Sequence, residues 1–161
     1  MGISGDPNLK MNLLYIGPYQ AGSTSRMRGE VLKSLCPVMH FYVVDTSVPF
    51  NAGNKLLRSI AFRFKRGPLI SQINCYIIQT IAAIPASFFD LIWIDKAIFI
   101  TSKTTQFLRS LTNKLVHYTP DMAFLGNQSH HFKKSIPFFN TAFAYGLFII
   151  QDSFLQPSSN Y

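Results

Sequence analysis

The segment NLLYIG, residues Asn12–Gly17, is a run of apolar side chains that ends at a glycine and is followed by Pro18. A continuous apolar run of this length is typical of a strand buried on both faces. The small-residue loop after it, residues 17–25, leads into a segment with the apolar spacing of a helix, carried by Met27, Val31, Leu32 and Leu35. A hydroxyl at residue 23, 24 or 25 can cap this helix. The sequence therefore predicts an initial strand–loop–helix unit.

The rest of the chain continues to alternate between strand and helix patterns. Strands are predicted at residues 38–45, 90–94, 115–118 and 143–150. Helices are predicted at 54–65, 68–83, 103–111 and 133–139, and residues 46–53 are predicted to be a loop. This alternation predicts a Rossmann-like three-layer α/β domain with a mostly parallel sheet and helices on both faces. Ligands of such sheets bind beyond the carboxyl ends of the strands, which selects the loops at 17–25, 45–53, 95–101 and 117–128.

The composition fits one folded domain. Of 161 residues, 48% are hydrophobic and 14% are charged, against roughly 25% charged in ordinary soluble domains. This excludes a disordered chain, and two cysteines exclude a disulfide scaffold. We predict a flexible lead-in at 1–10, a single domain at 11–155 and a frayed tail at 156–161. Cys36 and Cys75 are predicted to be reduced and buried in the core.

The charge is strongly basic and concentrated in one segment. The formal net charge is +8, and no acidic residue lies between Asp45 and Asp90. Five cations fall within residues 55–66: Lys55, Arg58, Arg63, Lys65 and Arg66. Such a cluster attracts phosphate on a membrane surface, a nucleotide or a nucleic acid, although it can also be a solvated helix face. The sequence has no nucleic-acid-binding motif, which disfavours that partner.

Neither a signal peptide nor a membrane span is predicted. Residues 1–10 lack the apolar stretch of a signal peptide. The longest uncharged run, residues 67–89, is interrupted by polar side chains and has helical apolar spacing, which favours a buried amphipathic helix over a span. We therefore expect a cytoplasmic protein that the basic cluster can place at the inner face of the membrane.

The loop after the first strand carries the clearest binding motif. Gly17 and Gly22, followed by Ser23 and Thr24, come close to a nucleoside-triphosphate loop, but Ser23 stands where that motif needs lysine. The dinucleotide glycine fingerprint is absent as well. A glycine loop at a helix start, with Arg26 and Arg28 nearby, predicts a site for a phosphate or a sugar hydroxyl. The alternative is a tight turn that needs glycine for its backbone.

Polar residues also follow two later strands. Asp95 and Lys96 end the strand at 90–94, and His117 and Asp121 surround the end of the strand at 115–118. Histidine and aspartate beside a cleft are natural acid–base or hydroxyl-binding groups. The alternatives are an exposed strand end for Asp95 and Lys96, a helix cap for Asp121 and a hydrogen-bonded core side chain for His117. The histidine and cysteine spacings fit no zinc pattern, so no metal site is predicted.

Several of these motifs resemble segments of one enzyme family. LLYIGP at Leu13–Pro18 and GSTSRMRGE at Gly22–Glu30 resemble the first strand, glycine loop and first helix of GT-B-fold glycosyltransferases. DLIWIDK at Asp90–Lys96, LVHYTPD at Leu115–Asp121 and NQS at Asn127–Ser129 are similar to a bacterial branch that includes the spore-maturation-type enzymes. The likeness covers residues 12–139.

The resemblance implies an activity and roles for individual residues. Such enzymes move a sugar from a nucleotide-sugar to a hydroxyl acceptor without an essential bound metal. Their N-terminal domain mainly binds the acceptor, and their C-terminal domain holds most of the nucleotide-sugar. The resemblance implies an N-terminal domain only, inactive without a partner half that supplies the donor-binding domain. The resemblance places Gly22 and Ser23 near the donor phosphate or the transferred sugar, and His117 and Asp121 on the acceptor side. Together with the sequence patterns above, this predicts catalytic roles for His117, Asp121 and Asp95. It predicts substrate or phosphate contacts for Gly17, Gly22, Ser23, Thr24, Arg26 and Lys96.

A second hypothesis needs no catalysis. The chain would be a Rossmann-like binding module whose basic cluster attaches it to an anionic membrane or to another phosphate-bearing partner. The resemblance supports a membrane role too, because the same cluster is similar to the membrane-facing patch of family members that glycosylate lipids. The two hypotheses differ in whether a sugar substrate binds at the strand ends.

Overall fold

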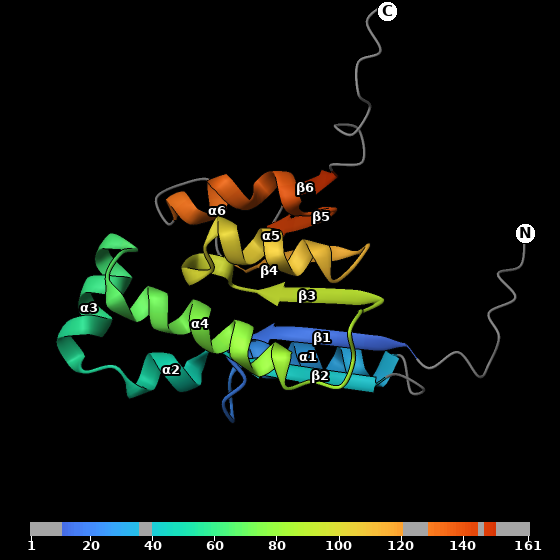
Figure 1. The fold of residues 1–161 in the computed structure, drawn as a ribbon, viewed down its shortest axis with the longest axis horizontal. Helices are drawn as coiled ribbons and strands as arrows, with labels where there is room; N and C mark the ends of the chain where they lie inside the picture. Colours follow the sequence, from blue (N-terminus) through green and yellow to red (C-terminus); the bar gives the residue numbers. More distant parts are fainter. Residues whose placement is uncertain (1–10, 36–39, 121–128, 145–146, 151–161) are drawn as a thin grey trace, which may run out of the picture.

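The fold is described by a computed structural model, which covers residues 11–35, 40–120, 129–144 and 147–150 (Figure 1). Helices and strands alternate along most of the chain. The elements in chain order are β1 (Asn12–Gly17), α1 (Thr24–Leu35), β2 (His40–Asp45), α2 (Ser47–Ala52), α3 (Lys55–Phe64), α4 (Pro68–Ala82), β3 (Leu91–Asp95), the 3-10 helix η1 (Ala97–Phe99), α5 (Ser102–Ser110), β4 (Leu115–Thr119), α6 (His130–Ser135), the 3-10 helix η2 (Ile136–Phe138), β5 (Thr141–Ala144) and β6 (Leu147–Ile150).

The strands form one sheet in the order β2-β1-β3-β4-β5-β6. The first five strands in this order are parallel to their neighbours, and β6 pairs antiparallel with β5. The Rossmann-like α/β fold predicted from the sequence is confirmed. Because β1 has β2 on one side and β3 on the other, the carboxyl ends of these three strands meet at one edge.

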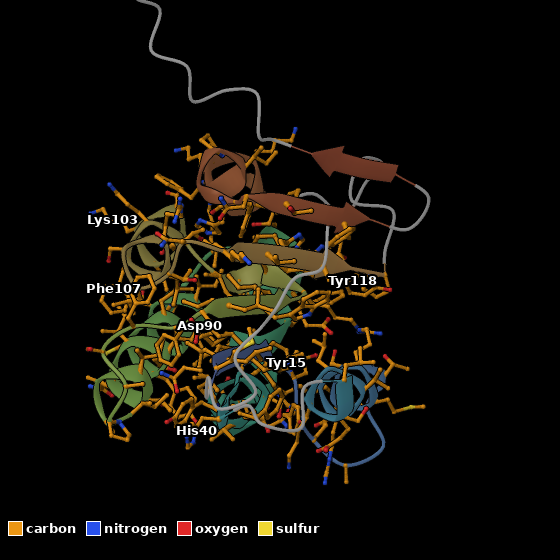
Figure 2. The ribbon with its side chains drawn as sticks, turned by 90° about the vertical axis from the view of Figure 1, so that its right-hand side faces the viewer. Tyr15, His40, Asp90, Lys103, Phe107 and Tyr118 are labelled. Atoms are coloured by element: carbon orange, nitrogen blue, oxygen red, sulfur yellow. The ribbon has the colours of Figure 1, made fainter. Side chains whose placement is uncertain are left out.

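Helices lie on both faces of the sheet, as predicted. Figure 2 shows α1 on one side and α4, α5 and α6 on the other. We call these two sides the α1 face and the opposite face. Side chains alternate between them along each strand. The main core lies on the opposite face, where Ile16, Ile92 and Ile94 pack with Ile73 and Ile77 of α4 without exposure to solvent.

Capping residues explain why several predicted helix boundaries are confirmed. Asn54 accepts a hydrogen bond from the Leu57 amide at the start of α3. Gly67, with a φ of 109° that suits glycine, precedes Pro68 in the first turn of α4. Thr101 caps α5 by accepting from the Thr104 amide.

Three secondary-structure predictions are wrong. Residues 46–53, predicted as loop, contain the helix α2, which begins where the Asp45 carboxylate accepts from the amide and hydroxyl of Ser47. The helix predicted at 133–139 begins at His130, because Ser129 caps it by accepting from the His131 amide, and η2 follows at Ile136. The strand predicted at 143–150 is two antiparallel strands, β5 and β6.

The prediction for Cys75 is also wrong, because its side chain is exposed. On α4 the buried positions include Ile73, Asn74 and Ile77, and Cys75 points away from them. The predictions for Cys36, Asp121, the lead-in at 1–10 and the tail at 156–161 lie outside the described residues. Over the described ranges, no helix has both the length and the apolar character needed to cross a membrane.

Candidate functional site

A cavity of about 360 Å³ lies at the carboxyl ends of β1, β2 and β3. Its walls come from the segment after each of these strands and from α3. Crevices beyond the carboxyl ends of the strands, where strand order reverses, are the usual ligand sites of such sheets. Among the predicted contacts, Ser23, Thr24 and Lys96 line the cavity. The topology therefore brings together residues that are more than 70 positions apart in the chain.

One wall of the cavity is the start of α1. Ser23 caps the helix, since its hydroxyl oxygen accepts from the Arg26 amide at 3.1 Å. The amide N–H groups of Thr24 and Ser25 belong to the first turn, where no carbonyl of the helix can accept from them. They add the positive end of the helix dipole to a wall that also carries hydroxyl groups. This wall suits a phosphate or a hydroxylated group.

Glycine is required at the two positions of the loop, Gly17 and Gly22, for different physical reasons. Gly22 has a φ of 79°, and no atom lies within 4 Å of a Cβ built there, so its backbone conformation is what favours glycine. A Cβ at Gly17 would lie 2.9 Å from the Cβ of Asp95, so close packing against the end of β3 requires glycine there. The backbone of Gly22 fits the tight-turn alternative, whereas Gly17 is required by packing. The predicted ligand contacts of both residues stay predictions.

Lys96 supplies the cation of the cavity. Its backbone has φ 59° and ψ 64°, a left-handed conformation that is uncommon outside glycine. The Lys96 amide donates to the Tyr118 carbonyl at 2.9 Å, which ties this turn to the end of β4. The side chain is partly buried and lines the cavity. A strained position that places a cation beside a cavity is typical of a functional residue.

The other wall is aromatic, which the sequence analysis did not predict. Phe50 of α2 and Phe99 of η1 are stacked, with ring centroids 5.4 Å apart and planes 15° apart. Phe62 of α3 and Ile98 extend this wall. No local pattern in the sequence links these residues, because they come from three separate elements.

Asn74 holds the segment that carries part of this wall. Its amide nitrogen donates to the Phe99 carbonyl at 2.8 Å, and its oxygen accepts from the Thr101 amide at 2.9 Å. The same nitrogen lies 2.7 Å from the Ile70 carbonyl, one turn earlier on α4. A single polar residue within the apolar stripe of α4 was the signal that could have indicated this role.

An ion pair with a buried carboxylate and a partly exposed guanidinium lies beside the cavity. Arg28 of α1 donates from Nε to Oδ2 of Asp95 at 2.8 Å and from a terminal nitrogen to Oδ1 at 3.0 Å. The Asp95 side chain has no exposed surface. Burial lowers the pKa of Arg28, but the hydrogen bonds to Asp95 and the attraction of the Asp95 charge together raise it overall. The pair ties α1 to the end of β3.

Tyr15 and Tyr118 complete the surroundings of this pair. The Tyr15 hydroxyl lies 2.7 Å from Oδ2 of Asp95 and 2.6 Å from the Ser25 carbonyl, so its one proton is shared between two acceptors. Burial and the Asp95 carboxylate raise the Tyr15 pKa, which keeps the phenol protonated as a donor. The Arg28 guanidinium stacks 4.7 Å from the centre of the Tyr118 ring.

Arg26, predicted to contact phosphate, lies on the flank of α1 that faces β2. Its guanidinium is 5.8 Å from the centre of the Tyr19 ring and 4.0 Å from the Glu30 carboxylate, and both ion-pair partners are about half exposed. Burial and the hydrogen bond to Glu30 raise the pKa of Tyr19 to about 12. A role for Arg26 in phosphate binding stays a prediction.

His117 lies on the opposite face, between the rings of Phe132 and Phe139. The centre of its ring is 4.7 Å from that of Phe132 and 5.2 Å from that of Phe139. Only 2% of its surface is exposed. Its Nε2 accepts from the Ala97 amide at 3.3 Å, and its buried Nδ1 has no hydrogen-bond partner among the described residues. Burial lowers the His117 pKa to about 4, although the Asp95 charge acts in the other direction. This geometry fits a core histidine, and the acid–base roles of His117, Asp95 and Asp121 stay predictions.

Comparison with known proteins finds no matching family model, curated protein or solved structure. Over the described part of the chain, no three histidine, cysteine or acidic side chains gather as a metal site would require. The fold is therefore established by its own topology.

Proposed function

We propose that this chain is the acceptor-side half of a glycosyltransferase and that the cavity holds the polar end of its nucleotide-sugar and hydroxyl substrates. The observation that carries this proposal is the convergence of Ser23, Thr24 and Lys96 on one cavity at the strand ends. The resemblance of the strand–loop–helix segment to the GT-B enzymes indicates the enzyme class, a glycosyltransferase. No metal or organic cofactor has a part in the proposal, and the nucleotide-sugar is its donor substrate.

The two walls of the cavity suit the two parts of such a substrate. Hydroxyls and first-turn amides of α1 can donate to phosphate or sugar oxygens, and Lys96 neutralises charge. The stacked rings of Phe50 and Phe99 border the same space and offer an apolar surface to a sugar or base ring. In this proposal Asp95 is a positioning residue, because its carboxylate is taken up by Arg28 and Tyr15.

Binding is the direct test, since a half enzyme is expected to turn over poorly. Titration calorimetry with a panel of nucleoside diphosphates should show saturable binding by the wild-type chain. Lys96→Asn keeps a residue that tolerates the left-handed backbone but removes the cation. We expect it to weaken binding at least about tenfold, the loss of one charge-assisted hydrogen bond.

Lys103→Asn, an exposed change on α5, is the matched control and should bind as the wild type does. The proposal fails if no diphosphate binds, or if Lys96→Asn and Lys103→Asn bind equally well. Normal sugar transfer by the isolated chain would instead contradict the claim that it is only half of the enzyme.

A second candidate function rests on the exposed apolar side chains of α3, one of which, Phe62, also borders the cavity. Leu56, Phe62 and Phe64 are each more than half exposed there, and they stand among the five cations at 55–66. Exposed aromatic and leucine side chains beside cations are typical of segments that lie in the interface of an anionic membrane. We propose that α3 attaches the chain to such a membrane.

Vesicle sedimentation checks this attachment. Phosphatidylglycerol vesicles should bind the chain and phosphatidylcholine vesicles should not, and binding should weaken as salt rises. Replacing both Leu56 and Phe64 with Ser, which leaves the cavity lining unchanged, should lower the vesicle-bound fraction at least about tenfold, because two apolar side chains leave the interface. Phe88→Ser, which removes an exposed ring at the other end of the sheet, should leave binding unchanged. Equal binding by all three proteins excludes α3 as the contact.

A further inference from the structure

The backbone amide of Ala97 is bound by a side chain, the imidazole of His117. Ala97 begins η1 directly after Lys96, and its amide donates to His117 Nε2 at 3.3 Å. Ala97 and His117 are both buried. A backbone amide in such a place needs an acceptor within the protein, because bulk water does not reach it. The His117 side chain therefore satisfies a group that the turn after β3 would otherwise leave unpaired.

This hydrogen bond fixes the position of the imidazole proton. A neutral imidazole has one nitrogen that donates and one that accepts. Because Nε2 accepts from the Ala97 amide, the proton is on Nδ1, which is buried and has no hydrogen-bond partner among the described residues. A buried donor without a partner is unfavourable, and an apolar side chain at this position would avoid it. The feature that an apolar side chain cannot supply is the acceptor for Ala97.

Two neighbouring residues of β4 hold the peptide planes on the two sides of Lys96. The Lys96 amide, in the plane before the residue, donates to the Tyr118 carbonyl at 2.9 Å. The Ala97 amide, in the plane after it, donates to the His117 side chain. The angles φ and ψ of a residue are the rotations between these two planes. The two bonds to β4 therefore hold Lys96 in its left-handed conformation, at φ 59° and ψ 64°.

The bond to His117 ties the second of these planes to the sheet. The Lys96 carbonyl, in the same plane, accepts from the Ile98 amide at 2.8 Å, but this bond lies within the turn and moves with it. A left-handed backbone is unfavourable for a residue with a Cβ. Without the acceptor on His117, we therefore expect the plane to rotate and Lys96 to relax to a commoner conformation, which turns its side chain away from the cavity.

The segment that follows is held in the same way at its other end. Ile98 and Phe99 line the cavity together with Lys96. Asn74 of α4 binds the Phe99 carbonyl and the Thr101 amide through its side chain. Two buried polar side chains, His117 and Asn74, thus fix the two ends of one cavity wall through its backbone.

We propose that His117 is a positioning residue of the cavity, which holds the peptide after Lys96 and so directs the Lys96 cation into the ligand space. This inference deepens the proposed function and rests on it, because the contribution of Lys96 is its contact with phosphate. His117 acts through the backbone from the opposite face of the sheet and needs no contact with the ligand. The role therefore differs from the acid–base role predicted from the sequence.

Nitrogen-15 NMR of the histidine side chains tests the hydrogen bond in the unaltered chain. The sequence has four histidines, and the signals that disappear in His117→Phe are those of His117. At pH 7 we expect a neutral imidazole with its proton on Nδ1. A proton on Nε2 overturns the proposal, because Nε2 could then not accept from the Ala97 amide.

Ligand binding tests the effect on Lys96. His117→Phe fills the space but has no acceptor, and it should weaken the binding of nucleoside diphosphates about tenfold, as Lys96→Asn does. His117→Gln can place an amide oxygen near the position of Nε2, and it should restore most of the affinity. Adding His117→Phe to Lys96→Asn should cause no further loss, because one residue acts through the other.

Leu108→Val, a buried change on α5, is the control for lost core packing and should bind as the wild type does. Wild-type affinity in His117→Phe overturns the proposal, and so does a loss that adds in full to that of Lys96→Asn.

Hydrogen exchange of the Ala97 amide needs no ligand and separates this inference from the proposed function. Relative to the amides of β3, it should exchange at least about tenfold faster in His117→Phe than in the wild type. Unchanged exchange overturns the positioning role. If the wild type binds no diphosphate, the proposed function fails, while the imidazole proton and the exchange of the Ala97 amide still decide whether His117 holds the turn.

Discussion

Asp95→Asn is expected to lower the free energy of unfolding by about 1.5–3 kcal/mol, the range for hydrogen bonds to a charged group, because the Arg28 side chain is 24% exposed and water can solvate part of its charge. In the wild type, the Asp95 carboxylate accepts two hydrogen bonds from the Arg28 guanidinium. The substitution puts an uncharged amide in place of this carboxylate. It also weakens the hydrogen bond from the Tyr15 hydroxyl. Because the pair joins α1 to β3, its loss loosens the wall of the cavity. Urea unfolding at neutral pH measures the effect.

Glu30→Gln is the matched control for this prediction. Glu30 and Arg26 form an ion pair at 4.0 Å with both side chains about half exposed, and such pairs contribute less than about 1 kcal/mol. Replacing Arg28 with Met in addition to Asp95→Asn should recover part of the loss, since no unpaired charge then stays buried. If Asp95→Asn costs no more than Glu30→Gln, the pair does not hold α1 to the sheet.

When the pH drops from 7 to 4, His117 should lower the free energy of unfolding by about 3 kcal/mol. This loss comes in addition to the loss that protonation of the carboxylates causes. The His117 pKa is about 4 in the folded chain and 6.5 when unfolded. At pH above 6.5 both states hold the imidazole neutral, and its contribution to stability is complete. Between pH 6.5 and 4 the unfolded chain binds a proton that the folded chain does not, so unfolding becomes easier.

Comparison with His117→Phe isolates this contribution. Phenylalanine suits the cluster of Phe132 and Phe139, but it leaves the Ala97 amide without its acceptor, a cost that is the same at every pH. The readout is therefore the slope of unfolding free energy against pH, which should be shallower in this variant. His40→Gln, an exposed change, should keep the wild-type slope. Parallel slopes for all three proteins would show that the His117 pKa is not lowered in the folded chain.

The parts of the fold that the sequence predicted well are those with complete local signals. β1 has an apolar run bounded by glycine and proline, and α4 has Gly67 and Pro68 at its start and a long apolar stripe. The short helix α2 has no such signal, since six residues that include Pro49 show no helical period. The apolar run at 143–150 gave no sign that it divides into two strands.

The candidate site was predicted only in its position. Parallel topology places the residues after β1 and β3 at one edge of the sheet, so Ser23 and Lys96 meet there. The partner of Asp95 was not predictable, because Arg28 is 67 positions away and its spacing within α1 is unremarkable. Likewise, the stacking of Phe50 on Phe99 depends on how α2 and η1 pack, which no local pattern encodes.

The central position of β1 has a consequence for how the chain folds during synthesis. β1 emerges from the ribosome before the other described strands, but its contact with β3 spans 78 residues, as in the bond from the Asn12 amide to the Asp90 carboxylate. Only β2 is available before that, and a two-stranded parallel pair is a poor folding nucleus. The edge of β1 therefore stays open to chaperones and to other nascent chains until β3 has been made.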